Sequence, residues 1–132
     1  MSLARTVAAS LGVIYVLAGV VGFLPDPLVQ ASTTAGATAA LLGVFPINPL
    51  HNVVHLAIGA SLLYASMATA TARMASRVIG IVYVVVGLLG FVSPNGSGLL
   101  PLGGADIFLH LGTGVVLLTV GFMNTGDTRA AA

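Results

Sequence analysis

Four long apolar stretches dominate the chain, and polar positions inside them are few. They cover Thr6–Leu24, Pro49–Ala72, Ala75–Ser93 and Asp106–Met123. Each is close to the roughly 20 residues that a helix needs to cross about 30 Å of hydrocarbon. We therefore predict an all-α fold, an integral membrane four-helix bundle in which residues 1–132 form a single domain.

The second half of the chain repeats the small and polar positions of the first half. The opening helices correspond as Gly12-Val-Ile-Tyr15-Val-Leu-Ala-Gly19-Val-Val-Gly22-Phe23 and Gly80-Ile-Val-Tyr83-Val-Val-Val-Gly87-Leu-Leu-Gly90-Phe91. The return helices correspond as Pro46…His55-Leu56…Gly59 and Pro101…His110-Leu111…Gly114. We predict two helical hairpins, repeat one over about 5–72 and repeat two over about 73–124, arranged as parallel repeats about an axis along the membrane normal.

Glycines in the first and third helices have a structural interpretation. Gly12 and Gly19, like Gly80 and Gly87, are seven residues apart and share one helix face. Small residues at such spacings let the backbones of membrane helices approach closely. We expect these glycines to pack against neighbouring helices.

Composition and charge fix the class and the orientation. Hydrophobic residues make up 58% of the chain and charged residues 5%, with a mean hydropathy of +1.11, whereas a soluble domain has roughly a quarter charged residues. The arginines fall on one side of four alternating helices: Arg5, Arg73, Arg77 and Arg129. Asp26 and Asp106 fall on the other side. The positive-inside rule predicts a multi-pass bacterial inner-membrane protein with both termini cytoplasmic.

A cleaved signal peptide is the alternative for the first helix, because Arg5 precedes an apolar run and Ala-rich sequence follows Pro27. The run is long, and it is the repeat partner of the third helix, which cannot be a signal. We expect the first helix to be retained.

The two outer connections differ in length. The first, about 25–48, is longer than the second, about 94–105. Its Ala31–Leu42 section is rich in Ala, Thr and Gly, and we expect a short interfacial helix there, suited to a lid or a partner contact. Asn48 as N-cap and Pro49 as first helical residue predict where the second helix begins.

The outer half of the bundle carries the most specific polar pattern. His51 and His55 lie four residues apart on the second helix, and Asp106 and His110 occupy the corresponding positions of the fourth. These four side chains are predicted to converge. Three imidazoles and a carboxylate form a plausible ligand set for a divalent transition metal.

Other interpretations of the same residues stay open. Haem is one, with His55 and His110 as its two axial ligands. Another is a structural role, in which the histidines, with Asn52, hydrogen-bond between helices and to Tyr15 or Tyr83. A proton-handling or quinone-linked site is the last.

The stretch Leu42-Gly43-Val44-Phe45-Pro46-Ile47-Asn48-Pro49-Leu50-His51-Asn52-Val53-Val54-His55-Leu56-Ala57-Ile58-Gly59 is similar to the signature of the bacterial membrane-protein family catalogued as domain of unknown function 4383. The Gly22–Pro25 ending of the first helix and the His110-Leu111 pair resemble it too. The resemblance covers nearly the whole chain. It implies a four-helix bacterial inner-membrane protein and assigns no activity.

Enzymatic function finds little support in the residues. The chain has no Cys and no Lys, no catalytic Ser arrangement and no phosphate-binding loop, although hydrolysis at a metal-bound water remains open. No basic run suggests nucleic acid. We predict a non-enzymatic protein that serves as an accessory or interaction subunit of a larger membrane complex, or self-associates within the lipid bilayer. The alternative is a metal- or haem-binding membrane protein with a redox or proton-linked role.

Overall fold

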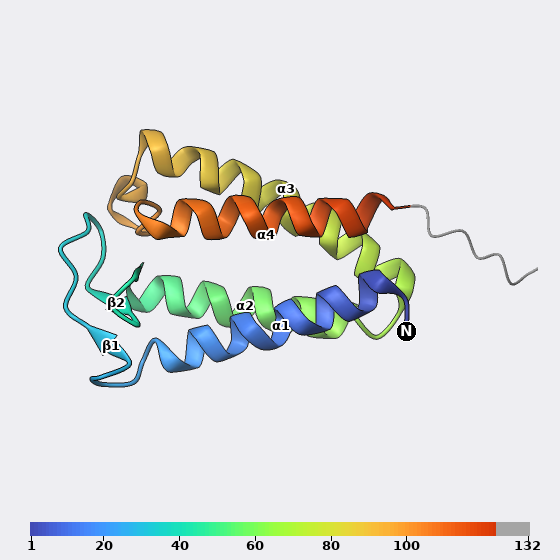
Figure 1. Cartoon of the computed structure of the whole chain (residues 1–132), viewed down its shortest axis with the longest axis horizontal. Coiled ribbons are helices and arrows are strands. Elements are labelled where there is room, and N and C mark those ends of the chain that lie inside the picture. Colours follow the sequence, from blue (N-terminus) through green and yellow to red (C-terminus); the bar gives the residue numbers. More distant parts are fainter. Residues whose placement is uncertain (124–132) are drawn as a thin grey trace, which may run out of the picture.

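The computed structural model describes residues 1–123, and its main elements are four helices. They are α1 (Leu3–Val21), α2 (Pro49–Ala65), α3 (Thr69–Val92) and α4 (Ala105–Phe122). They run along the long axis of the molecule, with α1 packed on α2 and α3 packed on α4 (Figure 1). Three of them, α1, α3 and α4, are long and apolar enough to cross a membrane. The prediction of a mainly helical protein with helices able to cross a membrane is confirmed, although α2, with 17 residues, is shorter than the other three. Arg129, used to predict the orientation, lies outside the described residues.

The turn between α2 and α3 comes earlier than predicted. We expected the second helix to reach Ala72, whereas α2 ends at Ala65. Polar side chains satisfy the end of α2, because Ser66 donates its hydroxyl to Leu63 O at 2.7 Å and Thr71 donates to Ala65 O at 2.7 Å. Arg5 adds its Nε–H to Ser66 O at 2.7 Å. Hydroxyl groups that bond nearby carbonyls compete with helix continuation, so the chain turns there.

The expected interfacial helix at Ala31–Leu42 is wrong. The first connection forms a three-stranded antiparallel sheet of β1 (Val29–Gln30), β2 (Ala39–Leu41) and β3 (Phe45–Ile47). Leu42 and Gly43 both have positive φ, 54° and 71°, which turns the chain sharply between β2 and β3. A hairpin turn with left-handed residues and the pairing it permits override the weak helical preference of Ala-rich sequence.

Glycines set the spacing within each helix pair. A Cβ added to Gly12 would lie 3.0 Å from Gly59 O, and one added to Gly80 would lie 3.1 Å from Gly114 O. A Cβ on Gly59 would come 2.6 Å from the backbone nitrogen of Val16. Only glycine lets the backbones approach this closely, so the expected packing role of these glycines is confirmed.

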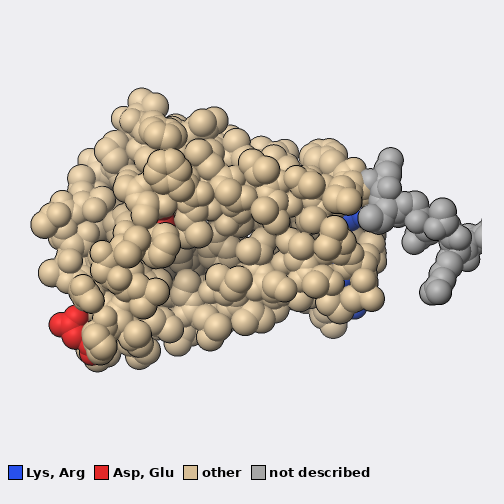
Figure 2. Space-filling view, viewed as in Figure 1, with Lys and Arg blue, Asp and Glu red and all other residues tan. Residues whose placement is uncertain are grey.

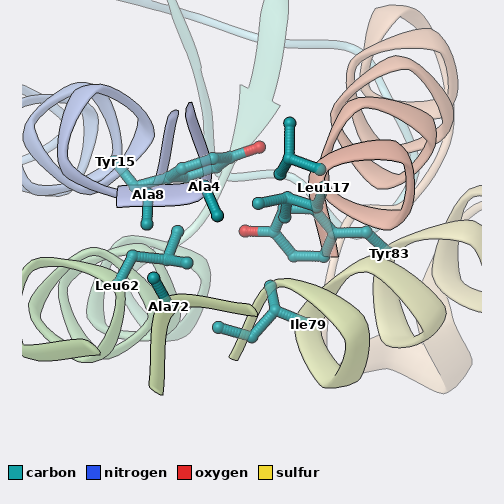
Figure 3. Close-up of a cluster of buried hydrophobic side chains, with 9 residues drawn as sticks. Ala4, Ala8, Tyr15, Leu62, Ala72, Ile79, Tyr83 and Leu117 are labelled. Carbon is teal, nitrogen blue, oxygen red and sulfur yellow. The ribbon is translucent and has the colours of Figure 1, made fainter. Parts of the chain in front are cut away.

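Small and aromatic side chains fill the interior, and large apolar ones face outward. Ala8, Leu62, Tyr15 and Tyr83 belong to one buried cluster, in which both tyrosine rings point into the space between the helices (Figure 3). Exposed apolar side chains cover the outer faces of the helices, for instance Phe108, which is 72% exposed. On the visible face, uncharged residues cover the flanks and the basic ones lie at the end where α1 begins (Figure 2). Such a surface suits contact with lipid rather than water.

Candidate functional site

The first turns of α2 and α4 place the polar residues of the interior. His51 and His55 lie in α2, and Asp106 and His110 lie in α4, and all four are buried. Asn48 fixes the start of α2, because its Oδ1 accepts a hydrogen bond from His51 N at 2.8 Å. The predicted N-cap is thus confirmed.

Asn48 also joins the two outer connections above this site. Its side-chain amide donates to Leu99 O at 2.9 Å and to Gly36 O at 3.2 Å. The helix start that carries His51 is therefore held to both connections at once.

The three histidines converge, as the sequence predicts. Each offers one ring nitrogen such that these nitrogens all lie within 4.8 Å of one another. The ring centroids of His51 and His55 are 4.3 Å apart, and those of His51 and His110 are 6.1 Å apart with nearly parallel planes. We call His51, His55, His110 and Asp106 the histidine cluster.

Asp106 lies against two of the imidazoles. Its Oδ2 is 3.3 Å from His51 Nε2 and 3.8 Å from His110 Nδ1. The second contact is too long for a hydrogen bond, and both carboxylate oxygens lack a hydrogen-bond partner. The carboxyl group is placed to meet a positive charge at the centre of the cluster.

Several polar atoms of the cluster are buried without a hydrogen bond. Both ring nitrogens of His55, Nδ1 of His51 and of His110, and both oxygens of Asp106 belong to this group. An unsatisfied buried donor or acceptor costs about 1–3 kcal/mol, more when it is charged. Such a concentration at one point in the described part of the chain needs a functional explanation.

The tyrosines meet the histidines through their rings rather than their hydroxyls. Tyr15 lies edge-on to His55 at 5.2 Å between ring centroids, and Tyr83 lies edge-on to His110 at 5.1 Å. The Tyr15 hydroxyl donates instead to Oγ1 of Thr113 at 3.1 Å, and the Tyr83 hydroxyl has no hydrogen-bond partner. The tyrosine–histidine hydrogen bonds of the structural interpretation are therefore absent for these two tyrosines, and aromatic packing takes their place.

Asn52, the third residue predicted to make an interhelical polar contact, does so. Its amide donates to Gly22 O at 2.8 Å and thereby joins α2 to the end of α1. The contact lies beside the cluster and contributes no group to it.

Two cavities flank the histidine cluster. The larger, of about 530 Å³, lies between α1 and α4 beneath the three-stranded sheet, and His55, Asp106 and Thr113 line it. The smaller, of about 180 Å³, lies between α2 and α3, where His51, His55 and His110 line it. His55 alone among the cluster's histidines borders both.

Sequence reasoning missed Thr113 and the part that the first connection plays. Thr113 lies one helical turn after His110, on the same face, and that spacing was the available signal. Leu41, Phe45 and Ile47 of the sheet line the larger cavity. Their position depends on strand pairing that composition does not reveal.

A comparison with protein families identifies the chain. The family described as Domain of unknown function (DUF4383) matches residues 5–123, which include the whole histidine cluster and all four helices except the first two residues of α1. The chain belongs to this family. No curated protein and no solved structure matches it.

Proposed function

We propose that this DUF4383 protein is a bacterial inner-membrane protein that holds a divalent transition-metal ion in its histidine cluster. The observation that carries the proposal is the approach of three buried imidazole nitrogens to within 4.8 Å of one another. Around a tetrahedral ion with metal–nitrogen bonds of 2.0–2.1 Å, ligand atoms are about 3.3 Å apart. Metal binding would require rotations of the imidazole rings that close this difference.

The donor set favours a metal on chemical grounds. Three imidazoles suit Zn, Cu, Fe or Ni, and the Asp106 carboxylate would offset part of the ion's charge in a low-dielectric interior. An ion would also engage ring nitrogens that lack hydrogen bonds. With Asp106 as the fourth ligand the site is closed, as in metal sites that store or stabilise rather than catalyse. A non-enzymatic role follows from this proposal.

The same geometry favours a single metal ion over haem as the ligand of the histidine cluster. Of the two cavities, His55 and His110 share only the smaller one, of about 180 Å³. This cavity is smaller than the roughly 300–1,000 Å³ of pockets that bind drug-sized ligands, and a porphyrin is a ligand of at least that size. The accessory-subunit role stays a prediction, since lipid accounts equally for the exposed apolar faces.

The proposal includes two parallel repeats with both termini in the cytoplasm. Corresponding contacts support the repeat: an added Cβ at Gly19 and at Gly87 would meet Leu56 and Leu111, respectively, which occupy matching positions of α2 and α4. The basic end of the bundle, with Arg5 and Arg77, supports the orientation. The cluster then lies in the outer half of the bilayer.

The test is metal binding by protein purified in mild detergent. We would measure bound metal by elemental analysis, then titrate the stripped protein with Co²⁺ and record the visible spectrum, which reports tetrahedral coordination. His51→Ala, His55→Ala and His110→Ala should each weaken binding by at least about 100-fold, since even an outer-shell partner contributes about 10–100-fold. Tyr83→Phe is the matched control, because it keeps the ring beside His110 and removes only a hydroxyl without a partner.

Near-stoichiometric metal that is lost in the histidine variants and kept in the control supports the proposal. Absence of Co²⁺ binding by the folded, stripped protein overturns it. Binding that survives all three substitutions would place the ion elsewhere and overturn it too.

A further inference from the structure

The larger cavity suggests a second binding site beyond the metal site, and His55 and Asp106 border both. It occupies about 530 Å³ between α1 and α4, within the range of pockets that bind small molecules. Its lining is almost entirely apolar, apart from a polar end formed by Tyr15, His55, Asp106 and Thr113. One apolar body with one polar end is the shape of an amphiphile.

The cavity borders the surface that faces lipid. Ile14 and Leu17 of α1 and Leu42 of the first connection line it, and these side chains are 56%, 56% and 57% exposed. In the space-filling view the surface is hollowed between α1 and α4 (Figure 2). A ligand dissolved in the bilayer can therefore enter sideways without crossing water.

The polar end selects an uncharged head. No arginine lines the cavity among the described residues, and Arg5 and Arg77 lie at the opposite end of the helices. In the metal-free protein a phosphate or carboxylate head would lie beside Asp106 without a compensating cation, which is strongly unfavourable in an apolar site.

The hydrogen-bonding groups at that end match a hydroxyl. Asp106 is 0% exposed, lines the cavity, and has two carboxylate oxygens without a hydrogen-bond partner, so one oxygen stays an acceptor when the other meets the ion. Thr113 accepts from the Tyr15 hydroxyl and keeps its own proton free to donate. A hydroxyl has one proton, so it can donate to Asp106 and accept from Thr113. The ligand's hydroxyl would then give a hydrogen-bond partner to one of the buried polar atoms that lack one.

We propose that this cavity binds a lipid-soluble molecule with an apolar chain and a neutral, hydroxyl-bearing head. A membrane quinol and a long-chain alcohol share this chemistry. The sheet β1–β3 covers the outer end of the site, and the ligand's chain lies along α1.

Photolabelling in phosphatidylcholine vesicles tests the site. The probe is para-decylphenol with a diazirine in its chain, and the labelled peptides are mapped by mass spectrometry. We expect label on α1 and α4 around the cavity. Ala18→Phe, which fills the cavity, should lower the amount of label at least about tenfold. Ala60→Phe, on the exposed face of α2, should leave the amount of label unchanged.

The head is tested separately. Thr113→Val keeps the cavity volume and removes one hydrogen bond to the probe, so probe affinity should fall about 2- to 10-fold. It also removes the acceptor of the Tyr15 hydroxyl, so Tyr15→Phe is measured beside it as the control for that loss. Unlabelled para-decylphenol should compete with the probe, and decylbenzene, which lacks the hydroxyl, should not. If a decyl quinol competes and decanol does not, the site requires a hydroxyl on a ring. If decanol competes as well, the site accepts any hydroxyl head. Both results support the site.

Three results would overturn the inference. They are equal labelling of Ala18→Phe and wild type, equal competition by decylbenzene, and stronger competition by decylamine, which would indicate a cationic head. Ala18→Phe retains all three histidines, so its Co²⁺ binding should be unchanged. Loss of the lipid site and loss of the metal site are thus separate observations.

Discussion

The cavities on the two sides of the histidine cluster occupy corresponding places in the two halves of the chain, yet they differ about threefold in volume. Tyr15 in the larger corresponds to Tyr83 in the smaller. Ala18 and Thr113 of the larger correspond to the bulkier Val86 and Ile58. The connection above also differs, since a three-stranded sheet covers one cavity and a short loop the other. Within the two repeats that we propose, modest differences in side-chain size and one longer loop account for the difference in volume.

The unequal cavities also receive unequal polar groups. Asp106 faces the larger one, while His51, its counterpart, faces the smaller. A carboxylate that lines a cavity can accept a hydrogen bond from a ligand that carries a donor. An imidazole packed among other imidazoles suits an ion. The pair of grooves thus divides the proposed tasks between lipid and metal.

The largest effect is expected from His55→Ala, because His55 borders both cavities. Metal affinity should fall by at least about 100-fold, and labelling by the phenol probe should fall as well. Co²⁺ titration and photolabelling of one preparation measure both. If His55→Ala impairs neither, the cluster does not connect the two sites.

Next comes Asp106→Asn, which removes the carboxylate charge at nearly constant volume. Because Asp106 Oδ2 lies within 4 Å of two imidazoles, metal affinity should fall about 10–100-fold. Asp26→Asn, in the first connection, is the control and should leave Co²⁺ affinity unchanged. Equal affinities of the two variants would remove Asp106 from the site.

Exchanging the side chains that set cavity size should affect stability in opposite directions. Val86→Ala enlarges the smaller cavity and should lower the free energy of unfolding by about 1–2 kcal/mol. Ala18→Val fills part of the larger one and should leave stability unchanged or raise it by about 0.5 kcal/mol. Thermal unfolding in detergent compares the two. Equal destabilisation would mean that the larger cavity is already closely packed.

The smallest difference is expected between the tyrosines. Tyr15→Phe removes the hydrogen bond to Thr113 and should cost about 0.5–1.5 kcal/mol of unfolding free energy. Tyr83→Phe removes a hydroxyl that has no partner and should be neutral or slightly stabilising. The same thermal measurement separates them, and a larger loss for Tyr83→Phe would show that its hydroxyl is bonded in solution.

Much of the helical fold could be read from local pattern, and the errors fall where long-range contacts decide. The starts of α2 at Pro49 and α4 at Ala105 lie within a residue of the prediction, since a cap and apolar runs define them. The helix expected at Ala31–Leu42 does not form, because Ala39–Leu41 pairs as β2 with Phe45–Ile47 across a turn of left-handed residues. Helix propensity describes single residues and their neighbours, so it cannot predict such pairing between separate segments.

The sequence by itself determined the helices, the glycine faces and the spacing that puts His51 with His55, and Asp106 with His110, on single helix faces. These follow from hydrophobicity and from 3.6 residues per turn, which are properties of neighbouring residues. Only the tertiary structure decided that the Tyr15 hydroxyl bonds Thr113, that the imidazole nitrogens of α2 and α4 meet, and that a cavity remains beneath the sheet. Those features arise where segments distant in the chain pack together, and the volumes left between them depend on every side chain at the contact.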